Sequence, residues 1–162
     1  MLTSLHVRDF AIIDEVELDL AGGMTVLTGE TGAGKSILLD ALGLVLGDRA
    51  DGSAVRHGAE RAEITASMDT SELAAVREWL EEHDLDADGE CVVRRVVGRE
   101  GRSRAYINGA STTLQTLRQL GERLIDIHGQ HAHQSLVRPA VQREILDDHG
   151  GHEAAVAALA EA

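Results

Sequence analysis

Hydrophobic and polar residues alternate with a period of two near the start of the chain. In EVELDL, the apolar residues Val16, Leu18 and Leu20 each follow an acidic residue. A strand with this period packs one face on a core and exposes the other to water. The pattern predicts strands over residues 2–8 and 12–20, followed by a turn at AGG.

The pattern changes on either side of a glycine-rich stretch. Residues 24–28, MTVLT, are a short apolar run and predict a strand that leads directly into that stretch. The segment SILLDALGLVL after it is apolar on most sides, as in a buried helix, and ends near Gly47. A further strand is expected over residues 62–69.

Two capping signals precede amphipathic helices. Asp69 with Glu72, and Thr112 with Gln115, stand three residues apart as in a capping box. The apolar faces of the two helices are Leu73, Val76 and Leu80 in the first, and Leu114, Leu117 and Leu120 in the second.

A hairpin is predicted between these two helices. CVVRRVVG and SRAYING are its strands, GREGR connects them, and the turn pair Asn108 and Gly109 closes it. Further along, RLIDI predicts a short strand, HGQHAHQSL a polar loop, and Pro139 the start of a helix. HEAAVAALAEA is helical with no cap or stop signal, so we expect the chain to be the front piece of a longer protein.

The composition is that of a globular domain with an aliphatic core. Hydrophobic residues make up 43% of the 162 residues, whereas Phe10, Trp79 and Tyr106 are the whole aromatic set. We expect Trp79 and Tyr106 to pack in the core or at its rim. Cys91, which has no partner for an intrachain disulfide, is expected to be a small buried side chain. No apolar run approaches the roughly 18 residues of a membrane span, and no signal-peptide pattern is visible, so we expect a cytoplasmic protein.

The net charge of −13 changes what the chain can bind. Such an acidic protein is not a general polyanion binder, so contact with DNA would need a local basic patch. Five arginines on the predicted hairpin, against the single acid Glu100, form such a patch: Arg94, Arg95, Arg99, Arg102 and Arg104. One interpretation is that these arginines contact DNA phosphates. The alternative is that they are ordinary exposed arginines of a hairpin. No aromatic residues interleave to form a stacking platform for single strands.

GETGAGKS, residues 29–36, matches G-x-x-x-x-G-K-[ST] in every position. The glycines let successive backbone N–H groups point at phosphate oxygens, and the helix that follows adds its positive end. The signal predicts binding of ATP with Mg²⁺, and Ser36 can ligate the metal through its hydroxyl. The expected nucleotide-binding residues are Gly29, Glu30, Thr31, Gly32, Ala33, Gly34, Lys35, Ser36 and Ile37.

Lys35 is the one lysine among 15 basic side chains. We expect it to act catalytically at the β- and γ-phosphates. A slim ammonium fits the space over the loop, whereas a planar guanidinium is wide and prefers a bidentate fork.

The motif leaves three interpretations open: an ATP-binding-cassette ATPase, a small P-loop kinase, or an interaction module in which the loop is only structural. Two strands before the loop are typical of the cassette lobe. The chain of a small P-loop kinase usually begins with the strand that leads directly into the loop. A Walker B strand is not evident. Asp126 in LIDI follows two apolar residues, and Ile127 stands where a catalytic Glu would be.

Four blocks carry a more specific resemblance: LHVRDFAIIDEVELDL, TGETGAGKSILLDALGLVLGDRA, RSRAYING and LIDIHGQHAHQSL. They resemble the N-terminal lobe of the RecN family, bacterial double-strand-break repair ATPases of the SMC-like, ATP-binding-cassette class. The resemblance implies an α/β P-loop fold with an antiparallel β subdomain. Residues 1–150 would be the lobe with Walker A and Q-loop, and residues 151–162 the start of a coiled-coil arm. The family's later motifs, an LSGG-type signature, Walker B and a switch histidine, do not occur in this sequence.

The resemblance also implies residue roles. Gln130, with Gln134 as the fallback, matches the Q-loop glutamine that ligates Mg²⁺ and helps position the attacking water; the alternative is a solvated loop residue. Arg56 resembles an arginine directed at the nucleotide phosphates, against the alternative of a surface arginine. A zinc site is not expected, since three nearby histidines lack cysteine or acidic partners at suitable spacing: His128, His131 and His133.

The implied partners are DNA, a second head that sandwiches ATP with the first, and the C-terminal lobe of the same head. The implied setting is the cytoplasm, in association with the nucleoid and without membrane contact. This chain alone is expected to bind MgATP weakly and to hydrolyse it barely or not at all.

Overall fold

The computed structural model describes residues 1–29, 34–125, 127 and 139–160. The chain forms two compact units, Met1–Asp126 and Ile127–Ala162. The functional division expected at residue 150 stays a prediction.

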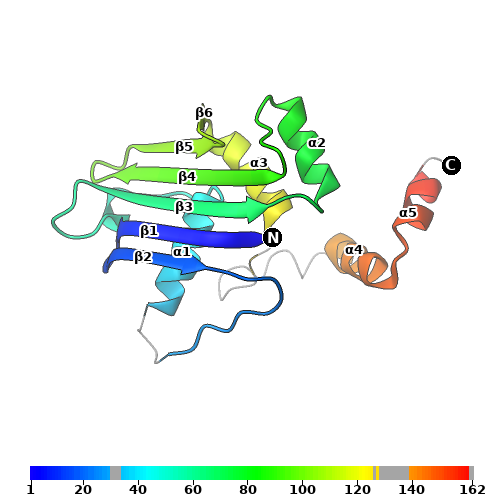
Figure 1. Ribbon diagram of the computed structural model, residues 1–162, viewed down its shortest axis with the longest axis horizontal. Helices are drawn as coiled ribbons and strands as arrows, with labels where there is room; N and C mark the ends of the chain where they lie inside the picture. Colours follow the sequence, from blue (N-terminus) through cyan, green and yellow to red (C-terminus); the bar gives the residue numbers. More distant parts are fainter. Residues whose placement is uncertain (30–33, 126, 128–138, 161–162) are drawn as a thin grey trace. The chain divides into compact units, whose positions relative to one another are not determined.

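The first unit is built on one antiparallel sheet (Figure 1). Its strands are β1 (Leu2–Phe10), β2 (Ile13–Asp19), β3 (Arg61–Asp69), β4 (Glu90–Gly98), β5 (Ser103–Ile107) and β6 (Ala110–Thr112). They lie in the order β2-β1-β3-β4-β5-β6, so β2 and β6 are the edge strands. The predicted strand pair before the glycine-rich stretch and the predicted hairpin of β4 and β5 are confirmed.

Helices cover one face of this sheet. The helices of the first unit are α1 (Lys35–Val45), the short 3-10 helix η1 (Gly52–Ala54), α2 (Ala74–Glu82) and α3 (Leu114–Leu124). Contacts join α1 to β1, β3 and β4, and α3 to β5 and α2. Figure 1 shows α1 and α3 on the same side of the sheet. The structure is therefore an α/β fold with an antiparallel β subdomain, as the sequence predicted.

The core lies between these helices and the covered face of the sheet. Its aliphatic side chains are 0–4% exposed and include Leu5, Val7, Ile64, Val93, Val97, Ile107, Leu117 and Leu120. Burying each such side chain contributes about 1.5–3 kcal/mol. Trp79 and Cys91 are also buried, as predicted, and burial raises the pKa of the Cys91 thiol to about 11.

The apolar run at residues 24–28 does not form the predicted strand. Met24 and Val26 are 87% and 70% exposed. A strand of continuous apolar residues needs neighbouring strands and cover on both faces. In the described part of the chain, this run pairs with no strand, and the edge strand β2 pairs only with β1.

The predicted capping boxes are both wrong in detail. Asp69 Oδ1 instead accepts hydrogen bonds from the Ser71 hydroxyl at 2.6 Å and the Ser71 N–H at 2.9 Å, an Asx turn that lowers the pKa of the Asp69 carboxyl. The helix then begins later, at Ala74. In α3 the cap is Thr113, one residue after the predicted one, and its hydroxyl oxygen accepts from the Thr116 N–H at 3.1 Å.

Two further differences concern the end of the sheet and the end of α3. Asn108 and Gly109 both have positive φ, 47° and 81°, and this turn adds the unpredicted strand β6. The predicted strand RLIDI is wrong over its first residues, because α3 continues through Arg123 to Leu124. The Arg123 guanidinium donates to the carbonyl of Gln119 at 2.6 Å within that last turn.

The second unit contains α4 (Pro139–Gly150) and α5 (Glu153–Ala160). Both helices were predicted from the sequence. Gly151, at φ 66°, separates them, and the His152 N–H donates to the carbonyl of Asp147 at 2.9 Å. The role of α5 as the start of a coiled-coil arm stays a prediction.

A Gly121→Ala substitution tests the contact between α3 and the end of α1. A Cβ at Gly121 would overlap the backbone carbonyl oxygen of Leu46. We expect a loss of about 1–3 kcal/mol in the free energy of unfolding, measured by urea denaturation. Alanine has the higher helix propensity by about 1 kcal/mol, so unchanged or increased stability would contradict this packing. Gly22→Ala, where an added Cβ meets Met1 at an ordinary 3.6 Å, is the control.

A pair of threonine substitutions tests the position of the α3 cap. Thr113→Ala removes the acceptor of the Thr116 N–H and should cost about 1 kcal/mol in the same measurement. Thr112→Ala, at the residue that the sequence pattern favours, should cost clearly less. The reverse order of the two losses would place the cap at Thr112.

Candidate functional site

The glycine-rich stretch ends at the first turn of α1. Gly34 precedes the helix in a left-handed conformation, φ 92°, which favours glycine. The first turn of α1 contains no acidic residue, and no side chain caps it. The N–H groups and positive end of the helix are therefore not neutralised by a carboxylate of α1, which suits an anion.

Lys35 links the two ends of the motif. Its ammonium donates a hydrogen bond to the backbone carbonyl of Gly29, six residues earlier. Ser36 follows at the second position of α1 and is exposed. The structure thus brings Gly29, Gly34 and Lys35 together, whereas the predicted residues between them, Glu30, Thr31, Gly32 and Ala33, lie outside the described residues.

Arg56 is held against the turn between β1 and β2. Its N–H donates to the carbonyl of Asp9 at 2.8 Å, and the Ala11 N–H donates to the carbonyl of Ala54 at 2.8 Å. The Arg56 guanidinium donates to the Asp14 carboxylate at 3.0 Å. Exposed ion pairs contribute about 0–1 kcal/mol, so Asp14 orients Arg56 without immobilising it. Sequence reasoning missed Asp14, because no local pattern indicates a pairing across 42 residues.

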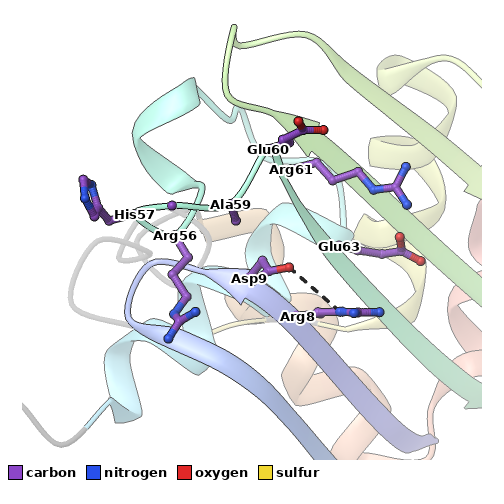
Figure 2. A pocket seen from close by; sticks show the side chains of 9 residues that line it. Arg8, Asp9, Arg56, His57, Ala59, Glu60, Arg61 and Glu63 are labelled. Carbon is purple, nitrogen blue, oxygen red and sulfur yellow. Dashed lines mark ion pairs between the residues drawn. The ribbon is translucent and has the colours of Figure 1, made fainter.

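Arg56 also lines a polar surface cleft of about 700 Å³ (Figure 2). Basic and acidic side chains alternate around it, and Arg8 lies 3.9 Å from the carboxylate of Asp9. The remaining charged lining residues are Arg61, Glu60 and Glu63. With three arginines and three acids, this cleft has no excess of either charge.

The five arginines predicted as a DNA patch do not share one surface. Arg94 lies on the uncovered face of the sheet, where its Nε contacts the Glu63 carboxylate at 2.7 Å and its guanidinium lies 5.5 Å from the centre of the Tyr106 ring. Arg95 points to the covered face and is 1% exposed. The prediction of an exposed Arg95 is therefore wrong, because successive side chains on a strand point to opposite faces. The exposed arginines near the hairpin tip are Arg99, Arg102 and Arg104.

Several predicted functional residues lie outside the described part of the chain. They are Asp126, His128, Gln130, His131, His133 and Gln134. Among the residues that are described, no group of three or more histidine, cysteine, aspartate or glutamate side chains could hold a metal ion. No helix among them is long and apolar enough to cross a membrane.

Comparison with known proteins places this geometry in a family. The AAA domain family matches residues 4–152. DNA repair protein RecN of Vibrio cholerae serotype O1 is 47% identical over 152 residues, 94% of this chain and 27% of the relative. DNA repair protein RecN of Bacillus subtilis is 39% identical over 154 residues, 94% of this chain and 27% of the relative. The chain thus spans about a quarter of the length of these relatives.

Solved structures show the same fold at low sequence identity. An SMC head bound to the C-terminal winged-helix domain of ScpA superposes with a TM-score of 0.65 at 23% identity, covering 91% of this chain and 50% of that one. The SMC head domain from Thermotoga maritima gives a TM-score of 0.56 at 21% identity, covering 73% and 41%. The fold is that of the first lobe of a P-loop ATPase head. The chain belongs to the AAA domain family, and its resemblance to RecN proteins, first indicated by four sequence blocks, is confirmed.

Proposed function

We propose that this chain is the ATP-binding portion of the head of a RecN-like DNA repair protein, in which ATP hydrolysis is coupled to DNA binding. The observation that carries the proposal is the complete phosphate-loop motif at the uncapped start of α1. The similar proteins named DNA repair protein RecN support the repair role. They favour an ATPase head over a small P-loop kinase or a structural module.

The residues around the start of α1 fit a nucleoside triphosphate with Mg²⁺. The Gly29 carbonyl, which accepts from the Lys35 ammonium, occupies the place that we assign to a phosphate oxygen. Amides of Gly34, Lys35, Ser36 and Ile37 would bind phosphate oxygens, and the Ser36 hydroxyl would ligate the metal. Bound Mg²⁺ would neutralise charge on the phosphates. Gln130 would position the attacking water, and Arg56 would approach the phosphates from the turn between β1 and β2.

The exposed apolar run at residues 24–28 supports a partner for this lobe. Met24, Val26 and Leu27 are 52–87% exposed, and such a run is typical of a strand that is completed by another part of a protein. We assign it to the C-terminal lobe of the same head, with a second head closing over the nucleotide. Without the signature and Walker B motifs, which this sequence lacks, hydrolysis by the chain alone is expected to be negligible.

DNA contact is assigned to the tip of the hairpin between β4 and β5. Arg99, Arg102 and Arg104 are exposed there, whereas Arg94 is already paired with Glu63. A local group of arginines in a chain of net charge −13 gives DNA phosphates one favourable place to approach. A protein that works on DNA in this way would be associated with the nucleoid in the cytoplasm.

Substitution of Lys35 tests the nucleotide site. In isothermal titration calorimetry, the wild-type chain should bind MgATP weakly. Lys35→Ala should weaken that binding by about 10- to 100-fold, because a hydrogen bond to a charged group is lost. Lys35→Arg should not restore it, because the guanidinium is too wide. Arg77→Ala, which removes an exposed charge on α2, is the control. Equal affinity for wild type and Lys35→Ala would exclude the proposed site.

Paired arginine substitutions test the DNA contact. Binding of a fluorescent duplex is measured by anisotropy at several salt concentrations. Arg102→Ala with Arg104→Ala should weaken binding and reduce the slope of log K against log salt by roughly 1–2, since each phosphate contact contributes about 0.9. The matched pair Arg77→Ala with Arg118→Ala should leave the slope unchanged. The same slope for both pairs would remove the hairpin tip from the DNA interface.

A further inference from the structure

The helix α1 packs on the sheet mainly through its second half. Its buried residues all lie there: Ala41, Gly43, Leu44 and Val45. In the first half, Ser36 and Asp40 are exposed, and Leu39 is 50% exposed. Within the described residues, the end of α1 that starts at Lys35 is therefore positioned largely by what holds the other end.

Two glycines bring the residues at that other end into backbone contact with α3. A Cβ at Gly121 would overlap the carbonyl oxygen of Leu46, and a Cβ at Gly47 would lie 2.7 Å from the Cα of Arg118. Gly121 and Gly47 are both buried. The atoms that they meet belong to the backbone, which cannot rotate aside as a long side chain can. The crossing therefore leaves no room for an additional methyl group.

The rigidity of α1 transmits a movement at this crossing to the phosphate-binding end. A helix of eleven residues is about 16 Å long, at about 1.5 Å per residue. The Leu38 N–H donates to the carbonyl of Gly34 at 3.1 Å, so Gly34 and the amides of the first turn move together with the helix. Groups that bind a ligand must be held within about 0.5 Å of their productive positions.

We propose that Gly121 is a positioning residue for the nucleotide site, because the close approach that it allows between α3 and Leu46 fixes where α1 lies. This inference rests on the proposed function, since it concerns the same phosphate-binding amides. A side chain at position 121 displaces Leu46, α1 tilts on the sheet, and its first turn leaves the place where it binds phosphate. MgATP affinity then falls although no group that contacts the phosphates has changed.

A pair of glycine substitutions at this end of α1 tests the proposal on the chain as given. Gly121→Ala pushes on a backbone carbonyl and lowers MgATP affinity in calorimetry by about 5-fold or more. Gly43→Ala is the matched control, because it adds the same methyl group to α1 itself. The atoms that this methyl meets belong to the carboxylate of Asp48, which is exposed and rotates away. The affinity of Gly43→Ala stays within about 2-fold of wild type.

An osmolyte separates displacement of α1 from a general loss of stability. Trimethylamine N-oxide favours the folded state, so it restores affinity that is lost through unfolding but not affinity that is lost through a displaced helix. The inference is overturned if the affinity of Gly121→Ala recovers in the osmolyte, equals the wild-type value, or is matched by that of Gly43→Ala. Each of these results leaves the proposed function standing where Lys35→Ala still weakens binding. No MgATP binding by the wild-type chain overturns both.

Discussion

The packing of α1 on the covered face of the sheet is the interaction on which the rest of the structure depends. Ala41, Leu44 and Val45 of this helix are buried against strands that are distant in the sequence, β1, β3 and β4. The same helix begins at the glycine-rich motif, so its packing decides where that motif lies relative to the sheet. Gly47 and Gly121 allow α3 to approach the end of α1 closely. The hydrophobic core and the proposed nucleotide site therefore both depend on the packing of α1.

The two faces of the sheet divide the chemistry of the chain. Aliphatic side chains fill the covered face, while the uncovered face carries polar contacts such as Arg94 with Glu63. This division is usual for antiparallel sheets, and it explains why charged residues of β1, β3, β4 and β5 do not disturb the core. Arg95 is the exception among the described residues, because it is a charged side chain on the covered face. Its burial on that face makes it part of the interior rather than a surface charge.

Much of the fold follows from local sequence patterns, and the failures have identifiable physical causes. Alternation in EVELDL predicts β2, and the Asn108–Gly109 pair predicts a turn with positive φ. The cap of α3 is displaced by one residue because two adjacent threonines can both accept a hydrogen bond. Counting arginines as one patch ignored the period of a strand, although neighbours such as Arg94 and Arg95 must face opposite sides. The strand at residues 24–28 fails because it depends on neighbours that local sequence does not supply, and the Asp14–Arg56 pair depends on tertiary contact.

The strand order also has a consequence for association between molecules. An edge strand with free N–H and C=O groups is a template on which another chain can add a strand. Here one edge, β6, is three residues long, which is too short to template an extended ladder. The other edge, β2, carries Asp14, Glu15, Glu17 and Asp19, and two copies of this strand placed side by side would repel each other. The sheet thus resists edge-to-edge aggregation at both ends, by brevity on one side and by charge on the other.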